Sequence, residues 1–310
     1  MRLLVVSKID PAALGRLRAE HDVVVDHNPG QERLAALIGD RQALIFRSGV
    51  TIGPSVLDRA PHLRLLIRAG SGFDNVDSDD LARRGIAFER IPGPGAQSVA
   101  ELTFAHLLAL ARNLLAADQS MRAGQWRKAE LTGRTLAGGT LGVVGLGTIG
   151  TRVARMGQAW GMRPVGCVER LATARAAHFA MLGIHLAALD EVLQTADFVT
   201  VHVPLQASTA HLLDERALSR LKPTAFLVNA SRGGVVDEAA LYEALRRGQI
   251  AGAGLDVHLV ERDGHTSPLA ALPNVVLTPH IGASTADSQR EIGLEIIRIV
   301  TALAHATVEV

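Results

Sequence analysis

Residues 140–161 read TLGVVGLGTIGTRVARMGQAWG, and this stretch indicates the fold of the surrounding chain. It begins with a short apolar run at 141–144, which is typical of a buried strand in a parallel sheet. Gly145, Gly147 and Gly150 follow with the spacing G-x-G-x-x-G. Apolar side chains then recur at helical spacing: Ile149, Val153, Met156 and Trp160. The stretch therefore predicts a strand, a glycine-rich turn and a helix.

Each glycine has a physical role in such a turn. The first, Gly145, allows a tight change of direction, and the second, Gly147, allows a pyrophosphate to approach the backbone. The third, Gly150, lets the helix pack closely against the strand, so that the helix N-terminus faces the phosphates. A glycine-rich structural turn is the alternative. Because strand, glycines and helix occur in the required order, we predict a dinucleotide-binding site.

The composition of the 310-residue chain limits the classes of protein to be considered. With 48% hydrophobic and 20% charged residues, it is typical of a globular protein of about two domains. The net charge of +1 argues against a nucleic-acid partner, and no apolar run of about 18 residues predicts a membrane helix. The start, MRLLVVSKID, is typical of a first strand and not of a signal peptide. A single cysteine, Cys167, excludes an intrachain disulfide or a cysteine-cluster metal site, so we expect a reducing, cytoplasmic compartment.

Residues 1–95 alternate between short apolar runs and helix-like runs, which predicts a parallel sheet with helices on its faces. The expected strands are 2–7, 23–26, 43–47 and 63–68, and the expected helices are 11–20, 31–39 and 53–60. Two strands end in arginine, at Arg47 and Arg68, and Gly70 and Gly72 follow the second. Ligands bind at the carboxyl ends of parallel strands, and backbone N–H groups can hold an anion there. Two surface arginines beside an ordinary turn are the alternative, but we expect an anion site.

The Pro/Gly-rich stretch IPGPGA, residues 91–96, predicts a hinge. Ser98 is expected to cap the helix that follows, with Glu101 as its capping-box partner. This helix, 98–122, is long and apolar, and we expect it to cross between domains and to pack against a second subunit. The amphipathic segment at 286–304 predicts a last helix that returns to the first domain.

The cofactor preference depends on the residues after the next expected strand, 163–168. A carboxylate about 20 residues past the glycine loop binds the adenosine ribose of NAD. Glu169 stands 19 residues after Gly150 and fits this role, whereas the adjacent Arg170 would suit the 2′-phosphate of NADP. Both cofactors stay open at this point, and NAD is favoured.

Four further strands are expected at 198–203, 225–229, 254–257 and 275–277, with polar residues near their carboxyl ends: His202, Arg232, Asp256 and His280. Of the residues in these loops, Arg232, Glu261 and His280 together suit hydride transfer to a 2-keto acid. An arginine fork can hold the carboxylate and polarise the carbonyl. Histidine can protonate the carbonyl oxygen near neutral pH, and a neighbouring carboxylate favours its protonated form. His258 and His265 are rivals for the histidine role, a solvated loop carboxylate is the alternative for Glu261, and no ligand spacing predicts a zinc site.

The motifs GLGTIG, HVPL, NASRGGVVDEAAL, AGAGLDV and PHIGAST occur in this order. Together with RAGSGFDNVD and SVAELT in the front half, they resemble the D-isomer-specific 2-hydroxyacid dehydrogenases, in particular the 3-phosphoglycerate dehydrogenase branch. The resemblance implies an α/β fold of two doubly wound parallel-sheet domains. These are a Rossmann NAD-binding domain over 97–286 and a flavodoxin-like substrate domain over 1–96 plus 287–310. It also implies a homodimer, and a short form without the C-terminal regulatory domain of some members.

The resemblance further implies roles for individual residues. Arg232 would bind the carboxylate and carbonyl, His280 would be the acid/base, and Glu261 would be its partner. The substrate would be held by Arg47, Arg68, Ala69, Gly70, Ser71 and Gly72. The cofactor, NAD with NADP as the alternative, would be held by Ser71, Gly145, Gly147, Thr148, Ile149, Gly150, Glu169, Arg170, His202, Val203, Pro204, Ala230, Ser231, Arg232, Asp256, His280 and Gly282. No metal is expected.

The arginine pair decides the expected substrate. Arg47 and Arg68 match residues that serve the anionic end of the substrate in the phosphoglycerate branch, so we expect a D-2-hydroxy or 2-keto acid with a second anionic group, such as 3-phosphoglycerate. An NADP-dependent glyoxylate/hydroxypyruvate reductase is the alternative, and a non-catalytic NADH-sensing binding protein is a further one. The chain departs from the family where F-x-x-E-P reads HLVER, at 258–262, and where the usual ribose-binding Asp is Val168.

Overall fold

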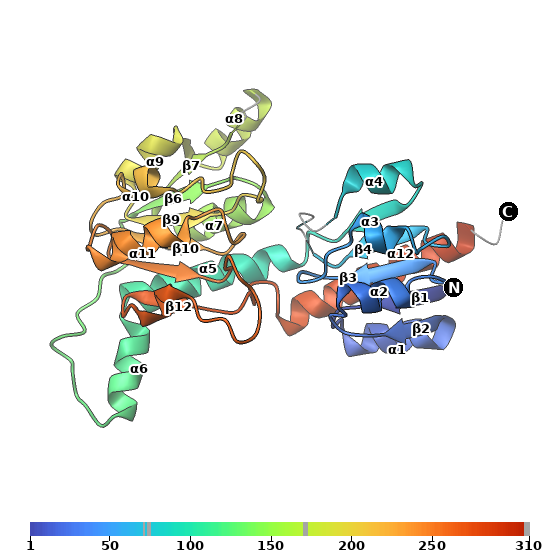
Figure 1. The fold of residues 1–310 in the computed structure, drawn as a ribbon. Helices are drawn as coiled ribbons and strands as arrows, with labels where there is room; N and C mark the ends of the chain where they lie inside the picture. Colours follow the sequence, from blue (N-terminus) through green and yellow to red (C-terminus); the bar gives the residue numbers. More distant parts are fainter. Residues whose placement is uncertain (71, 73–75, 170–172, 307–310) are drawn as a thin grey trace. The chain divides into compact units, whose positions relative to one another are not determined.

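The computed structural model describes residues 1–70, 72, 76–169 and 173–306 (Figure 1). Within it the chain forms two compact units. Unit 1 contains residues 1–98 and 283–310, and unit 2 contains residues 99–282. Two residues selected from the sequence, Ser71 and Arg170, lie outside the described residues. Each unit has one parallel sheet with helices, which confirms the predicted α/β class.

Unit 1 is built on a five-stranded parallel sheet with the strand order β2-β1-β3-β4-β5. This is the flavodoxin-like doubly wound order. Its elements are β1 (Arg2–Val5), α1 (Pro11–Glu20), β2 (Asp22–Val25), α2 (Gln31–Leu37), β3 (Ala43–Phe46), α3 (Pro54–Leu57), β4 (Leu65–Arg68), α4 (Ser78–Arg83), β5 (Ala87–Arg90) and α12 (Ala286–Ala306).

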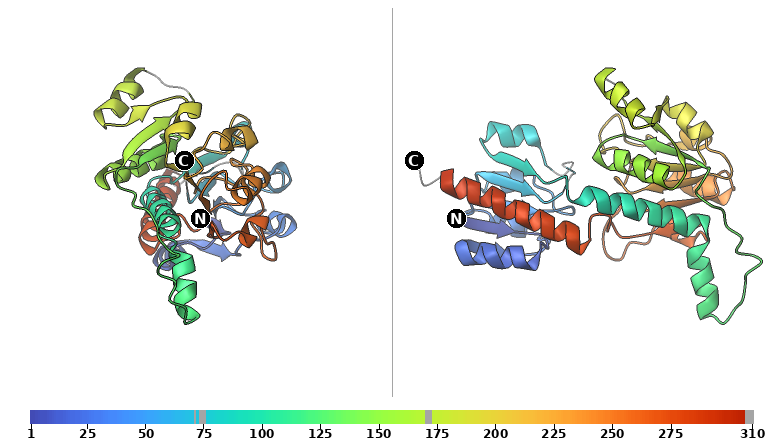
Figure 2. Two further views of the ribbon diagram at one scale, coloured as in Figure 1. Left: turned by 90° about the vertical axis from the view of Figure 1, so that its left-hand side faces the viewer. Right: turned by 180° about the vertical axis from the view of Figure 1, so that it is seen from behind.

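The strands of unit 1 bury side chains on both faces of the sheet. On one face, Leu3 and Val5 pack with residues of α1 and α12. On the other face, Leu4 packs with residues of α2, α3 and α4. Figure 2 shows α12, in red, lying along this sheet, which confirms that the last helix returns to the first domain. The elements α4 and β5 were not predicted, because the edge strand β5 is mostly exposed and has no apolar run.

Unit 2 is built on a seven-stranded parallel sheet with the strand order β12-β11-β10-β9-β6-β7-β8. The order is that of a Rossmann sheet extended by one strand, as predicted. Its elements are β6 (Thr140–Val144), α7 (Thr148–Ala159), β7 (Arg163–Cys167), α8 (Thr173–Met181), β8 (His185–Leu186), α9 (Leu189–Thr195), β9 (Phe198–Val201), α10 (Glu215–Leu218), β10 (Phe226–Asn229), α11 (Glu238–Arg246), β11 (Gly252–Leu255), the 3-10 helix η1 (Pro268–Ala271) and β12 (Val275–Leu277).

The single helix predicted over 98–122 is instead two helices, α5 (Gly95–Ala111) and α6 (Leu114–Arg122), which meet at an angle of 63°. Asn113, between them, has a left-handed backbone with φ of 50°. The capping box predicted at Ser98 is wrong, because α5 begins earlier and the Ser98 hydroxyl instead contacts the hydroxyls of Thr285 and Ser288 at 2.9 and 2.6 Å. Among the described residues, no single helix has the length and apolar character of a membrane span, and α5 and α6 meet that description only when taken together across their bend.

Candidate active site

All the strands of unit 2 run parallel, so the loops at their carboxyl ends lie along one edge of the sheet. The glycine loop follows β6. Arg232, Glu261 and His280 come from the loops after β10, β11 and β12, which are neighbours in the sheet. The topology therefore brings three residues that are far apart in sequence to one end of adjacent strands.

The glycine loop has the geometry that its three glycines suggested. Gly145 has a φ of +94°, and a Cβ there would stand 2.6 Å from the carbonyl oxygen of His202. A Cβ at Gly150 would stand 1.9 Å from the carbonyl oxygen of Gly145, so α7 can begin this close to the strand only with glycine. At Gly147 no heavy atom of the described residues lies within 4 Å of that position. The open side of Gly147, at the N-terminus of α7, fits a pyrophosphate of a dinucleotide.

The backbone carbonyl of His202 lies against Gly145 of this loop, and the ring of His202 differs from that of an ordinary surface histidine. Both of its ring nitrogens are buried and make no hydrogen bond within the described part of the chain, although the residue retains some exposure. Burial lowers the pKa of His202 to about 3. The ring is therefore neutral near pH 7.

Five other predicted cofactor residues border the same edge: Thr148 and Ile149 in the first turn of α7, Val203 and Pro204 after β9, and Glu169 after β7. Glu169 is exposed, which leaves its carboxylate accessible to a ribose.

The loop after β10 is shaped by the buried side chain of Asn229. Its carboxamide oxygen accepts hydrogen bonds from the backbone N–H and the hydroxyl of Ser231, and its Nδ2 donates to the carbonyl of Arg232. The Arg232 guanidinium donates to the Ser231 carbonyl at 2.7 Å and is partly buried. A Cβ at Gly233 would stand 2.0 Å from the carbonyl oxygen of His258, so this loop lies directly against the loop after β11. Ala230 belongs to the same turn and is buried.

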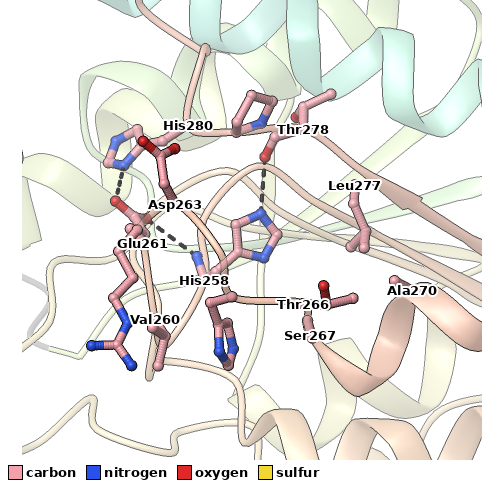
Figure 3. A pocket seen from close by; sticks show the side chains of 13 residues that line it. His258, Val260, Glu261, Asp263, Thr266, Ser267, Ala270, Leu277, Thr278 and His280 are labelled. Atoms are coloured by element: carbon pink, nitrogen blue, oxygen red, sulfur yellow. Dashed lines mark hydrogen bonds and ion pairs between the residues drawn. The ribbon is translucent and has the colours of Figure 1, made fainter.

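His280 and Glu261 form the central pair of the site (Figure 3). The Nδ1 atom of His280 lies 2.8 Å from Glu261 Oε2, and the other carboxylate oxygen accepts from the His258 backbone N–H at 3.2 Å. Partial burial alone would raise the pKa of Glu261, but the hydrogen bond and charge of His280, with a smaller contribution from His258, hold it below its usual value. Glu261 is therefore ionised near pH 7, beside a histidine that can carry the opposite charge.

Asp256 supports the turn that carries His280. It is 1% exposed, and its carboxylate accepts hydrogen bonds from the Thr278 hydroxyl and from the backbone N–H groups of Ile281 and Gly282, at 2.6 to 2.9 Å. The His280 N–H donates to the Asp256 carbonyl at 2.7 Å. His280 itself has a φ of 54°, an uncommon conformation for a residue other than glycine. The contacts of Asp256 therefore hold a turn that is costly in isolation.

A pocket of about 510 Å³ lies beside the His280–Glu261 pair. It is lined by residues of the segment 258–270 together with Leu277, Thr278, Pro279 and His280, and the side chains of the lining residues are drawn as sticks in Figure 3. The volume is in the range of small-molecule sites. The rivals considered from the sequence, His258 and His265, both line this pocket, but of the histidines in it only the ring of His280 is seen bonded to Glu261.

The residues selected for substrate binding belong to unit 1. Arg47 follows β3 and is half-buried, and burial lowers its pKa. Arg68 ends β4, is 5% exposed, and places its guanidinium over the Phe46 ring at 5.7 Å. Ala69, Gly70 and Gly72 follow in the same segment, and a Cβ at Gly70 would meet the Arg68 guanidinium at 3.0 Å. These residues form one group at the end of β3 and β4.

Three residues with contacts in the site were not selected from the sequence: Asn229, Thr278 and His106. Asn229 ends the expected strand 225–229, and Thr278 directly follows the expected strand 275–277. Their positions alone therefore did not distinguish them from other polar residues at strand ends. His106 lies on α5, and the signal available was a histidine within the otherwise apolar run FAHLLALA. Its ring nitrogen Nε2 lies 3.0 Å from the Thr278 hydroxyl.

Comparison with known proteins now decides the family. The family model described as "D-isomer specific 2-hydroxyacid dehydrogenase, NAD binding domain" matches residues 104–282. The chain belongs to the D-isomer-specific 2-hydroxyacid dehydrogenases. The match covers every strand of unit 2 and the loops that carry Arg232, Glu261 and His280. The resemblance drawn from the sequence motifs is therefore confirmed, and unit 2 is an NAD-binding domain of this family.

Individual relatives agree with the family. The chain is 41% identical over 298 residues to a D-3-phosphoglycerate dehydrogenase of Mycobacterium tuberculosis, a match over 96% of this chain and 56% of the relative. It is 37% identical to a hydroxypyruvate reductase of Thermotoga maritima, over 90% of both chains. A solved D-lactate dehydrogenase of Aquifex aeolicus with NAD and lactic acid superposes with a TM-score of 0.87 and 28% identity, over 100% of this chain and 97% of that one.

The chain spans little more than half the length of the D-3-phosphoglycerate dehydrogenases that it matches. Among the solved structures that match this member of the family, some contain NAD and others NADPH.

Proposed function

We propose that the protein transfers a hydride between NAD(H) and a D-2-hydroxy or 2-keto acid with a second anionic group, such as 3-phosphoglycerate. The observation that carries the proposal is the His280–Glu261 pair at 2.8 Å, located at the carboxyl edge of an NAD-binding sheet. Such a pair combines an imidazole that can act as a general acid or base with an ionised carboxylate beside it.

The proposed chemistry assigns one task to each residue. Since Nδ1 of His280 faces Glu261, Nε2 is left to donate a proton to the carbonyl oxygen of a keto acid, or to accept it in the reverse direction. The carboxylate of Glu261 would orient the ring through its contact with Nδ1. The guanidinium of Arg232 would bind the substrate carboxylate in a bidentate manner. When bound, the reduced nicotinamide supplies the hydride.

The cofactor would lie along the glycine loop. Gly145, Gly147 and Gly150 would accommodate the pyrophosphate, and Glu169 would bind the ribose hydroxyls. The remaining residues proposed to line it are Thr148, Ile149, His202, Val203, Pro204, Ala230, Ser231, Asp256 and Gly282. The carboxylate of Asp256 is already bonded to the turn of residues 278–282, so we assign it mainly to supporting that turn.

The second anionic group of the substrate would be bound in unit 1. The buried Arg68 and half-buried Arg47 lie at the ends of adjacent strands, next to the glycines of the 69–72 segment. Buried or half-buried guanidinium groups attract anions more strongly than exposed ones, because solvent screens them less. We therefore propose that this group of unit 1, with Ala69, Gly70 and Gly72, binds the second anionic group of the substrate.

The test is the loss of NADH absorbance with matched concentrations of glyoxylate, hydroxypyruvate, phosphohydroxypyruvate, sulfopyruvate and oxaloacetate, repeated with NADPH. We expect a preference for a dianionic keto acid with NADH. An Arg47→Ala variant should lose activity on the dianionic acids and keep it on glyoxylate, while the exposed Arg59→Ala is a matched control. Absence of turnover with all five acids would contradict the proposal, and a uniform loss in Arg47→Ala would contradict the role of that arginine.

An NADP-dependent glyoxylate/hydroxypyruvate reductase is the second candidate. The match to the Thermotoga maritima hydroxypyruvate reductase over 90% of both chains supports it. A preference for glyoxylate or hydroxypyruvate with NADPH in the same assay would favour this candidate. A protein that binds NADH and reduces none of the acids would favour an NADH-sensing role instead.

We also propose a homodimer in the cytoplasm. The helix α6 and the loop after it expose large apolar side chains, with Trp126 78% exposed and Leu114 and Met121 each 57% exposed, as expected of a subunit interface. The single cysteine supports a reducing compartment. Light scattering after size-exclusion chromatography would test the dimer, since a monomer at micromolar concentration would contradict it, and cell fractionation would test the location.

A further inference from the structure

Two histidines other than His280 converge on one residue of the turn that carries it. Thr278 stands two positions before His280 in the sequence. The Nε2 atom of His258 lies 2.9 Å from the Thr278 carbonyl oxygen, and the Nε2 atom of His106 lies 3.0 Å from the Thr278 hydroxyl. The first of these contacts is drawn in Figure 3.

The chemistry of the partners determines which atoms donate. A carbonyl oxygen only accepts hydrogen bonds, so His258 Nε2 carries a proton and donates. The Thr278 hydroxyl donates its single proton to Asp256 at 2.6 Å, so it accepts from His106 Nε2, which therefore also carries a proton. Both histidines thus donate to Thr278 from different elements of unit 2, His106 from α5 and His258 from the loop after β11.

The ring of His106 is enclosed in the sheet–helix interface. It is 2% exposed, and a Cβ at Gly254 of β11 would stand 2.6 Å from its Nδ1 atom. Burial lowers the pKa of His106, although the charge of Asp256 partly offsets this. The ring is therefore neutral near pH 7 and carries one N–H, the one directed at Thr278. Glycine at 254 leaves the space that this ring occupies.

We propose that His106 and His258 are positioning residues, which hold Thr278 from two sides and thereby fix the left-handed turn that orients His280. The inference rests on the proposed role of His280 as the acid/base. Thr278 links both rings to Asp256, which in turn binds Ile281 and Gly282 on the far side of His280. The turn is thus held before and after the residue with φ of 54°.

The test compares variants that remove a donor with variants that keep it. In His106→Leu the N–H is lost, whereas in His106→Gln the amide nitrogen can stand close to the position of Nε2. In the same way, His258→Phe keeps the ring volume and loses the donor, and His258→Gln keeps a donor. Thr103→Val is the matched control, since Thr103 is fully buried on the same helix and its hydroxyl bonds only to the Val99 carbonyl among the contacts described.

We expect His106→Leu and His258→Phe to lower kcat by about 10- to 100-fold, the effect of misplacing a catalytic group by a fraction of an ångström to an ångström, with KM for NADH unchanged. The two glutamine variants should recover most of kcat, and Thr103→Val should retain it. Amide hydrogen exchange at Ile281 and Gly282 should be faster in His106→Leu than in wild type and slow again in His106→Gln.

The exchange measurement separates this inference from the proposed function, because it needs no turnover. If wild type reduces no keto acid but exchange at Ile281 and Gly282 responds to His106→Leu and not to Thr103→Val, the turn is held as described and only the proposed function fails. Wild-type kcat in His106→Leu would overturn the positioning role. An equal loss of kcat in His106→Leu and Thr103→Val, or no recovery in His106→Gln, would also overturn it, since the effect would then be one of general stability.

Discussion

The loop after β6 and the loop after β12 lie at the same edge of one sheet, yet different parts of the chain hold them. The loop after β6 is shaped by its own glycines, and its tightest approach is between Gly150 and the Gly145 carbonyl. The loop after β12 is shaped by side chains that come from elsewhere, above all Asp256 and His106. The first loop is a backbone structure that leaves open space for a ligand, and the second is a side-chain network that holds the turn of His280, the proposed acid/base.

The same contrast applies to the two histidines near these loops. His202, whose backbone carbonyl lies against Gly145, is neutral because both ring nitrogens are buried without a hydrogen-bond partner among the described residues. The Nδ1 atom of His280, in contrast, lies 2.8 Å from the carboxylate of Glu261. One residue type at one edge of the sheet is therefore a neutral ring without a described partner in one place and a ring bonded to a carboxylate in the other, and its surroundings make the difference.

Removal of the His280 ring should produce the largest effect and would separate the tasks of the two loops. We expect His280→Ala to lower kcat by about 1,000-fold, as for loss of a general acid/base, while NADH still binds to the intact glycine loop. Initial rates of NADH oxidation and NADH fluorescence titration measure the two effects. His185→Ala, an exposed histidine on β8, is the control. A comparable loss of NADH binding in His280→Ala would mean that the two loops are not independent.

The buried, neutral ring of His202 should make the free energy of unfolding depend on pH. The folded-state pKa of His202 is about 3 and the unfolded value is 6.5, so the unfolded state binds more protons between these limits and stability falls as pH is lowered through this window. Each pKa unit corresponds to about 1.4 kcal/mol, so His202→Leu should reduce the loss of unfolding free energy between about pH 7 and pH 4.5 by roughly 3 kcal/mol. Urea unfolding at the two pH values measures it. An identical pH dependence in wild type and His202→Leu would show that the ring finds a partner or solvent.

Two glycine substitutions in the first loop should differ in effect, one lowering the free energy of unfolding and the other raising KM for NADH. A Cβ at Gly150 would overlap the Gly145 carbonyl, so Gly150→Ala should lower the free energy of unfolding by about 1–3 kcal/mol. Gly147 has open space and a φ of −78°, so Gly147→Ala should leave stability unchanged and raise KM for NADH by about 10-fold, through contact with the pyrophosphate. Thermal unfolding and steady-state kinetics measure these effects. If Gly147→Ala changed stability and not KM, the pyrophosphate would not lie on that side of the loop.

The difference between the two loops also explains what could be predicted from the sequence. The glycine loop depends on residues within a few positions of one another, so its shape followed from spacing and simple sterics. The strand-and-helix order followed similarly, from apolar runs and their periodicity. The pairing of Glu261 with His280 joins two separate loops, and only the residue types and the family resemblance pointed to it.

The predictions that failed depended on contacts distant in sequence or on one backbone angle. The Ser98 capping box is wrong because the hydroxyls that Ser98 contacts, Thr285 and Ser288, are almost two hundred positions away. The helix predicted to be continuous breaks at Asn113, which has a left-handed backbone conformation. The sequence did not reveal the break, because the apolar pattern continues on both sides of Asn113. His106 was not predicted, because its partner Thr278 is distant in sequence and comes close to it only in the folded structure.

The smallest expected effect concerns the positive φ angles of the two loops. The first loop takes its positive φ at Gly145, where glycine has no penalty, whereas the second takes it at His280, where an L-residue pays about 1–2 kcal/mol. Among inactive variants, His280→Gly should therefore be more stable than His280→Ala by about 1 kcal/mol. At His62, an exposed residue with negative φ, the order should be reversed by about 0.5–1 kcal/mol, because glycine there only adds freedom to the unfolded chain. Urea unfolding of the four variants measures these differences in the free energy of unfolding. If the Ala and Gly variants at position 280 were equally stable, the turn would carry no backbone strain, and the network around Thr278 would not be needed to stabilise it.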